Sequence, residues 1–112
     1  MVANEPLHYA GFLEALCQGE TVVSADNMVR IRTPRGALAM YSPTAFETAY
    51  GFAAPSLAEG PVLAGYRLQV ANREVALNQL DAAHVTWRQT PSGHAIGPDV
   101  ASGAVMAFSE VF

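Results

Sequence analysis

The arginines are the residues in this sequence whose type and spacing could form a binding site. All six of its lysine and arginine residues are arginines. Four of them lie in runs typical of β-strands: Arg30, Arg32, Arg67 and Arg88. Arg30 and Arg32 alternate with Val29 and Ile31, so a strand would turn both guanidinium groups to one face. A guanidinium binds a carboxylate or phosphate through two parallel hydrogen bonds, and such a face could hold an anionic ligand. The ordinary alternative is that these arginines pair with acids such as Glu20 or Glu47, or face solvent.

Histidine, tryptophan and cysteine are the other chemically capable residues. His8, His84 and His94 form no i, i+4 pair and have no accompanying acidic ligand, so they do not predict a metal site. His94 follows a turn at the start of a strand and could donate a hydrogen bond to a ligand or act as a base. Trp87 could offer a stacking surface or fill the core. Cys17, at the end of a helical pattern, is expected to be a buried structural cysteine.

Composition narrows the class of protein. The chain has 112 residues, enough for one domain, and 51% of them are apolar, which excludes a disordered chain. Charged residues make up 14%, against about 25% in an average globular domain. The net charge of −4 gives no support to a role on nucleic acid or on an anionic membrane. So few charges suggest that a partner, such as a second copy, covers part of the surface.

The sequence shows no pattern typical of a membrane span, a secretory signal or a disulfide framework. The longest apolar run, residues 37–41, is far shorter than the roughly 20 residues of a membrane span. Residues 1–6 have neither a basic nor an apolar stretch typical of a secretory signal. The single cysteine excludes an internal disulfide and a multi-cysteine zinc site. We expect a cytoplasmic protein.

The elements that would position these residues follow from periodicity. Residues 7–18 predict a helix, because Tyr9, Phe12, Leu13 and Leu16 fall on one stripe. Asn72 is a good N-cap for a second helix that runs to about Ala83. Two prolines and two glycines mark residues 51–62 as a linker. Strands are predicted at residues 21–24, 28–33, 37–42, 63–71, 85–89, 94–96 and 104–109.

The two halves of the chain repeat each other. Val2-Ala3-Asn4 precedes the first helix as Val70-Ala71-Asn72 precedes the second, and residues 36–42 match residues 103–109. We therefore predict an α+β fold of two βαβββ modules with a mostly antiparallel sheet. Residues 1–50 form an incomplete first module, 51–62 the linker and 63–112 the second module, together one domain.

Alternation assigns the residues of the second module to two faces of its sheet. The face toward the helix should carry Tyr66, Leu68, Val70, Met106 and Phe108. The opposite, concave face should carry Gly65, Arg67, Gln69, Val105 and Ala107.

Paired βαβββ modules of this length resemble the vicinal oxygen chelate superfamily, which includes glyoxalase I, extradiol dioxygenases, and bleomycin and fosfomycin resistance proteins. Residues 65–72 are similar to that superfamily's first strand running into its helix, and residues 103–108 to its last strand. Residues 29–36, then 41–43, Phe46 and Tyr50-Gly51, are similar to the glyoxalase-like domain group. The resemblance covers nearly the whole chain.

The sequence departs from that superfamily in two respects. Metal-dependent members place a His in a first strand and a Glu in a last strand, and the matching positions here are Gly65, Met40 and Ala107, so we expect no metal and no other cofactor. Glu110 is the nearest carboxylate, but the pleat places it on the wrong face. The first module also lacks most of its first strand. Either the chain is a fragment, or a partner chain supplies that strand at an unpaired sheet edge, which predicts a homodimer.

The resemblance and the arginines together give three hypotheses. In the first, the chain binds a small organic molecule, neutral or anionic, on its concave sheet without a metal, as resistance-type members do. The polar contacts would come from Arg30, Arg32, Arg67, Gln69 and His94, and the apolar walls from Met40, Trp87 and Val105. In the second, it is a lyase, isomerase or dioxygenase-type enzyme of the same superfamily. In the third, it is a non-catalytic dimeric module.

Overall fold

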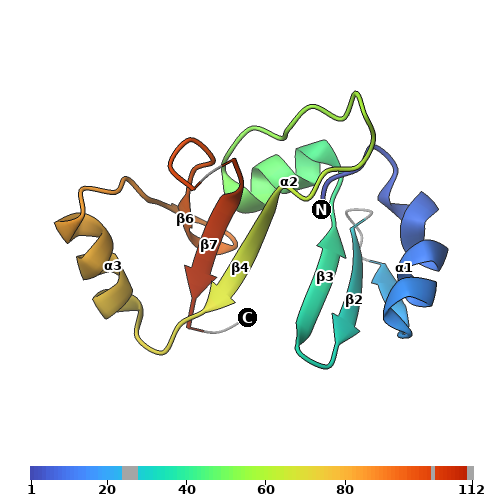
Figure 1. The fold of residues 1–112 in the computed structure, drawn as a ribbon, viewed down its shortest axis with the longest axis horizontal. Coiled ribbons are helices and arrows are strands. Elements are labelled where there is room, and N and C mark those ends of the chain that lie inside the picture. The colour runs from blue at the N-terminus through green and yellow to red at the C-terminus, as the bar shows by residue number, and fades with distance from the viewer. Residues whose placement is uncertain (24–27, 102, 111–112) are drawn as a thin grey trace. The chain divides into compact units, whose positions relative to one another are not determined.

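The computed structural model describes residues 1–23, 28–101 and 103–110. The chain forms two compact units (Figure 1). Unit 1 comprises Met1–Phe46 and Ala54–Leu63, and unit 2 comprises Glu47–Ala53 and Ala64–Phe112. The expected linker is therefore divided, because its first residues pack with unit 2 and the rest with unit 1.

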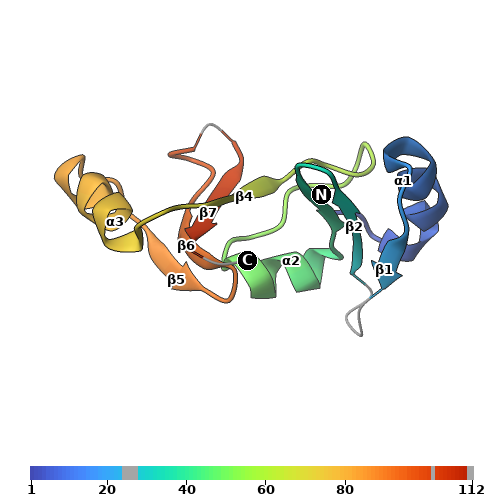
Figure 2. The same cartoon turned by 90° about the horizontal axis from the view of Figure 1, so that it is seen from below.

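Unit 1 is a helical segment on a three-stranded antiparallel sheet. The 3-10 helix η1 (Pro6–Tyr9) continues into α1 (Ala10–Cys17). The strands β1 (Thr21–Val23), β2 (Val29–Thr33) and β3 (Gly36–Met40) follow in the spatial order β1-β2-β3 (Figure 2). Pro6 begins η1, where a missing N–H costs nothing, and Gln18 ends α1 in a left-handed conformation.

The N-terminal residues supply a short first strand to this unit. The Met1 amine donates to Ala39 O at 2.7 Å, Tyr41 N donates to Met1 O at 2.8 Å, and Ala3 N donates to Tyr41 O at 2.9 Å, which is a parallel pairing with the end of β3. Val2 also pairs antiparallel with Val62 through two bonds of 2.8 and 3.0 Å. At Val2, the edge that we expected a partner chain to fill is thus paired within the chain. Homodimerisation stays a prediction, and light scattering in solution would measure it.

The core of unit 1 lies between α1 and one face of the sheet. Leu13, Val29, Ile31 and Met40 are the largest of its buried side chains, and Tyr9, Ala10, Cys17 and Leu38 pack around them. Each fully buried aliphatic side chain contributes about 1.5–3 kcal/mol. The expected helix stripe is partly wrong, because Phe12 and Leu16 are 62% and 64% exposed. The buried stripe instead follows Ala10, Leu13 and Cys17 at i, i+3 and i+7.

Unit 2 contains a complete βαβββ module. The strands β4 (Gly65–Gln69), β5 (Arg88–Thr90), β6 (Gly93–Ile96) and β7 (Val105–Ser109) form a sheet in the order β4-β7-β6-β5. β4 and β7 are parallel, and the other pairs are antiparallel. The helix α3 (Arg73–Ala82) connects β4 to β5 (Figure 2). Within the described residues, the α+β prediction with mostly antiparallel sheets is confirmed.

Helix α2 (Pro43–Tyr50) is not among the helices that periodicity predicts. Its signal is nevertheless present, because Ser42 is a good N-cap and Pro43 occupies the first helical position. Ser42 Oγ accepts a hydrogen bond from Ala45 N at 3.2 Å. Gly51 then ends the helix with φ +72°, and its N–H donates to Glu47 O at 2.9 Å.

Helix α3 is not buried against the sheet as expected. None of its residues is buried, and Tyr66 and Leu68 of the expected contact face are each 47% exposed. Phe108, on that same face, is buried because the His94 ring packs against it from β6. No helix in the described part of the chain is long and apolar enough to cross a membrane.

Two side chains hold the start of α3. Asn72 Oδ1 accepts from Val75 N at 3.2 Å, as its N-cap position predicts, and Glu110 Oε1 accepts from Arg73 N at 2.8 Å. Gln69 Nε2 also donates to Glu110 O at 3.0 Å, which fixes the end of β7 beside the start of the helix. The carboxylate stabilises the positive end of the helix dipole.

We predict that Glu110→Ala lowers the free energy of unfolding by about 0.5–1 kcal/mol, because one N-terminal donor of α3 loses its acceptor and the dipole loses a negative charge. Urea unfolding measures the change. Glu59→Ala is the matched control, since it removes an exposed carboxylate from a loop. Equal effects of the two substitutions would show that the contact at Arg73 N contributes nothing.

Candidate anion-binding face

The arginines of β2 lie on the sheet face opposite α1. Val29 and Ile31 are fully buried on the helix side, and Arg30 and Arg32 alternate with them. Across the ladder Arg30 pairs with Ala39 and Arg32 with Ala37. The two guanidinium groups therefore stand on the same face of one strand, next to residues too small to cover them.

In the part of the chain that the structure describes, no acid neutralises these two arginines. Neither Arg30 nor Arg32 forms an ion pair or a side-chain hydrogen bond with any residue that the structure describes, Glu20 included. Arg30 is half-buried and Arg32 is exposed, so both can reach a ligand. On β1, Val22 pairs with Arg30 and is 68% exposed, which adds an apolar neighbour on this face. We call Val22, Arg30, Arg32, Ala37 and Ala39 the arginine face.

Arg67 and Arg88 share one face of the unit 2 sheet. The row across the sheet runs from Arg67 through Ala107 and Ala95 to Arg88. Arg67 and Ala107 therefore share a face, as alternation along the strands predicts. Arg88 already has partners. Its guanidinium donates to Gly51 O at 2.6 Å and stacks 4.0 Å from the centre of the Phe52 ring, a cation–π contact. Arg88 thus anchors the segment after α2 to this face.

No pattern in the sequence predicts the contact of Arg88 with Gly51 and Phe52. Phe52 also covers Gly97, where an added Cβ would lie 2.8 Å from the Phe52 ring. A helix-terminating glycine followed by an aromatic residue is too common a pattern to reveal this contact. Gln69, another expected ligand residue, is exposed and uses its amide on Glu110 O.

His94 lies on the other face of the sheet, away from Arg67. It pairs with Phe108 across β6 and β7, and its ring contacts Phe108 at 5.8 Å and Trp87 at 5.0 Å between ring centres. The residue is 8% exposed, and neither ring nitrogen has a hydrogen-bond partner among the described residues. Burial lowers the pKa of His94 below its ordinary value, and the charge of Arg73 lowers it further. These surroundings are those of a neutral core imidazole.

Trp87, Met40 and Val105 also have structural surroundings. Trp87 Nε1 donates to Asp81 Oδ1 at 2.9 Å, while the indole packs on His94. Met40 is 1% exposed in the core against α1, on the face opposite the arginine face. Val105 is 2% exposed beside Gly65, where an added Cβ would lie 2.6 Å from Val105 O. Trp87 and Val105 belong to unit 2, whereas Arg30 and Arg32 belong to unit 1.

The residues at the superfamily's metal positions do not fit a metal. Gly65 has no ligating atom, Ala107 is fully buried, and Met40 belongs to the core. No group of three or more His, Cys, Asp or Glu residues in the described ranges could hold a metal ion. Glu110 uses its carboxylate at the start of α3.

Searches for related proteins found structural neighbours alone. No protein-family model matches the chain, and no curated protein does. A crystal structure of lactoylglutathione lyase from Agrobacterium tumefaciens matches with 13% identity and a TM-score of 0.37, covering 100% of this chain and 91% of that one. A glyoxalase/bleomycin resistance protein/dioxygenase from Nocardioides matches with 14% identity and a TM-score of 0.35, covering 96% and 78%. Both descriptions fall in the group that the sequence resembles.

The surroundings of His94 predict a pH-dependent stability. Because its pKa is lower in the folded chain than the ordinary 6.5, the unfolded chain binds the proton first as the pH falls. Stability is therefore full above about pH 6.5 and is lost as the pH drops below that value toward the folded pKa.

His94→Phe should remove this loss and stabilise the protein at pH 7 by about 1–2 kcal/mol, because two unpaired buried nitrogens disappear while the ring remains. Urea unfolding at pH 5 and pH 7.5 measures both effects. His8→Phe is the control, since it removes an exposed imidazole and should change the stability at pH 7.5 by less than about 0.5 kcal/mol. A His94→Phe protein that is less stable at pH 7.5 would mean that the imidazole is hydrogen-bonded.

Proposed function

We propose that this chain binds a small organic anion, a carboxylate or a phosphate ester, on the arginine face, as a metal-free binding protein of the glyoxalase and bleomycin resistance type. The observation that carries the proposal is the pair Arg30 and Arg32, which share one strand face and have no acidic partner in the described residues. The βαβββ order of unit 2 and the sequence resemblance support the type.

The physical basis is the chemistry of guanidinium groups. Residues two apart on a strand lie roughly 6–7 Å apart, which suits two oxygen-bearing groups of one ligand, or two oxygens of a phosphate approached from both sides. Ala37 and Ala39 leave room for a ligand to lie along the strand, and Val22 offers contact to its carbon skeleton. Hydrogen bonds between charged groups contribute about 1.5–3 kcal/mol each when the surroundings are partly dry.

Binding without chemistry is consistent with the groups on this face. It carries two permanent cations and apolar side chains, and neither a carboxylate nor an imidazole stands among its residues. General acid–base catalysis needs a group whose pKa lies near the working pH, and arginine does not supply one. The arginine face is therefore suited to holding an anion rather than to moving a proton.

The test is a titration with small anions. Isothermal titration with a panel of mono- and dicarboxylates and phosphate esters should find a ligand whose dissociation constant rises at least tenfold in the Arg30→Ala/Arg32→Ala protein. Arg35→Ala is the matched control, because it removes the same charge from the exposed hairpin between β2 and β3. Affinity should also fall as salt is raised from 0.05 to 0.5 M, since the site is open to screening.

Two results would overturn the proposal. In one, the anions that bind lose as much affinity in Arg35→Ala as in the double variant, which would mean a response to net charge alone. In the other, a ligand binds the double variant as tightly as the unmodified protein, which would place its site elsewhere. Circular dichroism of each variant shows whether the fold is retained.

A further inference from the structure

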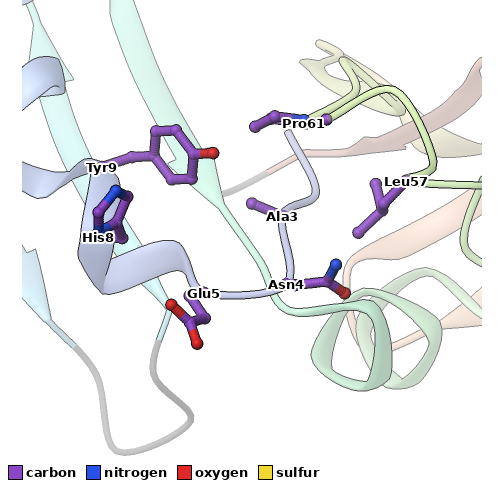
Figure 3. Close-up of a pocket in the computed structure, with 8 residues that line it drawn as sticks. Ala3, Asn4, Glu5, His8, Tyr9, Leu57 and Pro61 are labelled. Carbon is purple, nitrogen blue, oxygen red and sulfur yellow. The ribbon is translucent and has the colours of Figure 1, made fainter.

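A second candidate site lies in unit 1, between the N-terminal segment and the loop that returns to it. An open cavity of about 180 Å³ lies there. In Figure 3 the Tyr9 ring and the Leu57 side chain lie on either side of Ala3, and the Asn4 side chain lies below Ala3. Glu5, His8 and Pro61 also line this cavity.

Backbone hydrogen bonds hold the walls of this cavity in place. Val2 and Val62 exchange two bonds and join the two segments directly beside the cavity. On one side His8 N donates to Glu5 O at 3.0 Å in η1, and on the other Gly60 N donates to Leu57 O at 3.0 Å in a turn. A ligand would therefore meet walls that are already ordered, which lowers the entropic cost of binding.

The polar side chains of the lining are available to a ligand. Asn4, Glu5, His8 and Tyr9 form no side-chain hydrogen bond or ion pair with any described residue. The rings of His8 and Tyr9 touch edge to face at 5.4 Å, which fixes their relative orientation. Leu57 and Pro61 supply an apolar side to the same space.

The charges of the lining select the ligand. Glu5 is an acid, and neither arginine nor lysine lines the cavity. A small cation would be attracted by the Glu5 carboxylate and could rest on the Tyr9 ring, whereas that carboxylate would repel an anion with no guanidinium to offset it. We infer that this cavity binds a small organic monocation of the ammonium type, independently of the anion that we propose for the arginine face.

NMR titration of the ¹⁵N-labelled chain with tetramethylammonium chloride at pH 8 tests the inference. The amide signals of residues 3–9 and 57–61 should shift and saturate, while tert-butanol and sodium acetate at equal concentration should leave them unchanged. Glu5→Gln and Tyr9→Leu should each raise the dissociation constant about two- to five-fold, the size expected for a half-exposed charge or ring contact. Glu20→Gln removes an exposed carboxylate that does not line the cavity and should leave it unchanged.

Several outcomes would overturn this inference. Tert-butanol binding as well as the ammonium would show an unspecific apolar pocket, and Glu20→Gln weakening binding as much as Glu5→Gln would show a response to net charge. Shifts outside residues 3–9 and 57–61 would place the cation elsewhere. The Arg30→Ala/Arg32→Ala protein separates the two sites, since it should lose the anion and still bind the ammonium with unchanged affinity.

Discussion

The pairing of Met1–Ala3 with Tyr41 on one side and Val62 on the other is the constraint on which unit 1 depends. These residues satisfy backbone donors and acceptors at the edge of β3 that would otherwise face solvent or another chain. They also place Ala3 in the core beside Leu13 and fix the point from which η1 begins. The wall of the cavity at Glu5 and His8 follows directly from that starting point.

The pleat of β2 is the second constraint, and it links stability to function. Val29 and Ile31 must point toward α1 because they are the apolar members of the strand, and Arg30 and Arg32 then have no choice of face. A shift of register by one residue would bury both arginines and expose the core. The same burial that stabilises unit 1 therefore keeps the two cations together.

Periodicity predicted the βαβββ order, most strands and the N-cap of α3 well, because each depends on local signals. It did not predict the sheet face on which Met40 and His94 lie, because that face changes with every residue along a strand. The repeat aligned Met40 with Ala107, but Met40 pairs with Val29 on the helix side, whereas Ala107 lies on the face opposite His94. A one-residue gap in the alignment of the two halves shifts every later match by one position, and neighbouring positions of a strand lie on opposite faces.

Contacts between distant segments could not be predicted for a different reason. Arg88 on Phe52, Glu110 on Arg73 N and Val2 on Val62 each join residues more than 30 positions apart. Each depends on how segments far apart in the sequence meet in space, so no local pattern distinguishes the residues that take part. The cavity beside Val2 was missed for the same reason, since three of its eight lining residues come from residues 51–62, which were predicted to be a linker.

The low charge content explains how one small unit can offer sites of opposite sign. In a chain with an average share of charged residues, an exposed arginine usually has an acid within reach, and the two fields cancel at short range. Here 14% of the residues are charged, and Arg30 and Arg32 have no acidic partner among the described residues. Glu5 likewise has no basic one. Fields from such unpaired groups extend about 10 Å at 0.1 M salt, so a site keeps the sign of its own charges wherever no opposite charge lies within that distance.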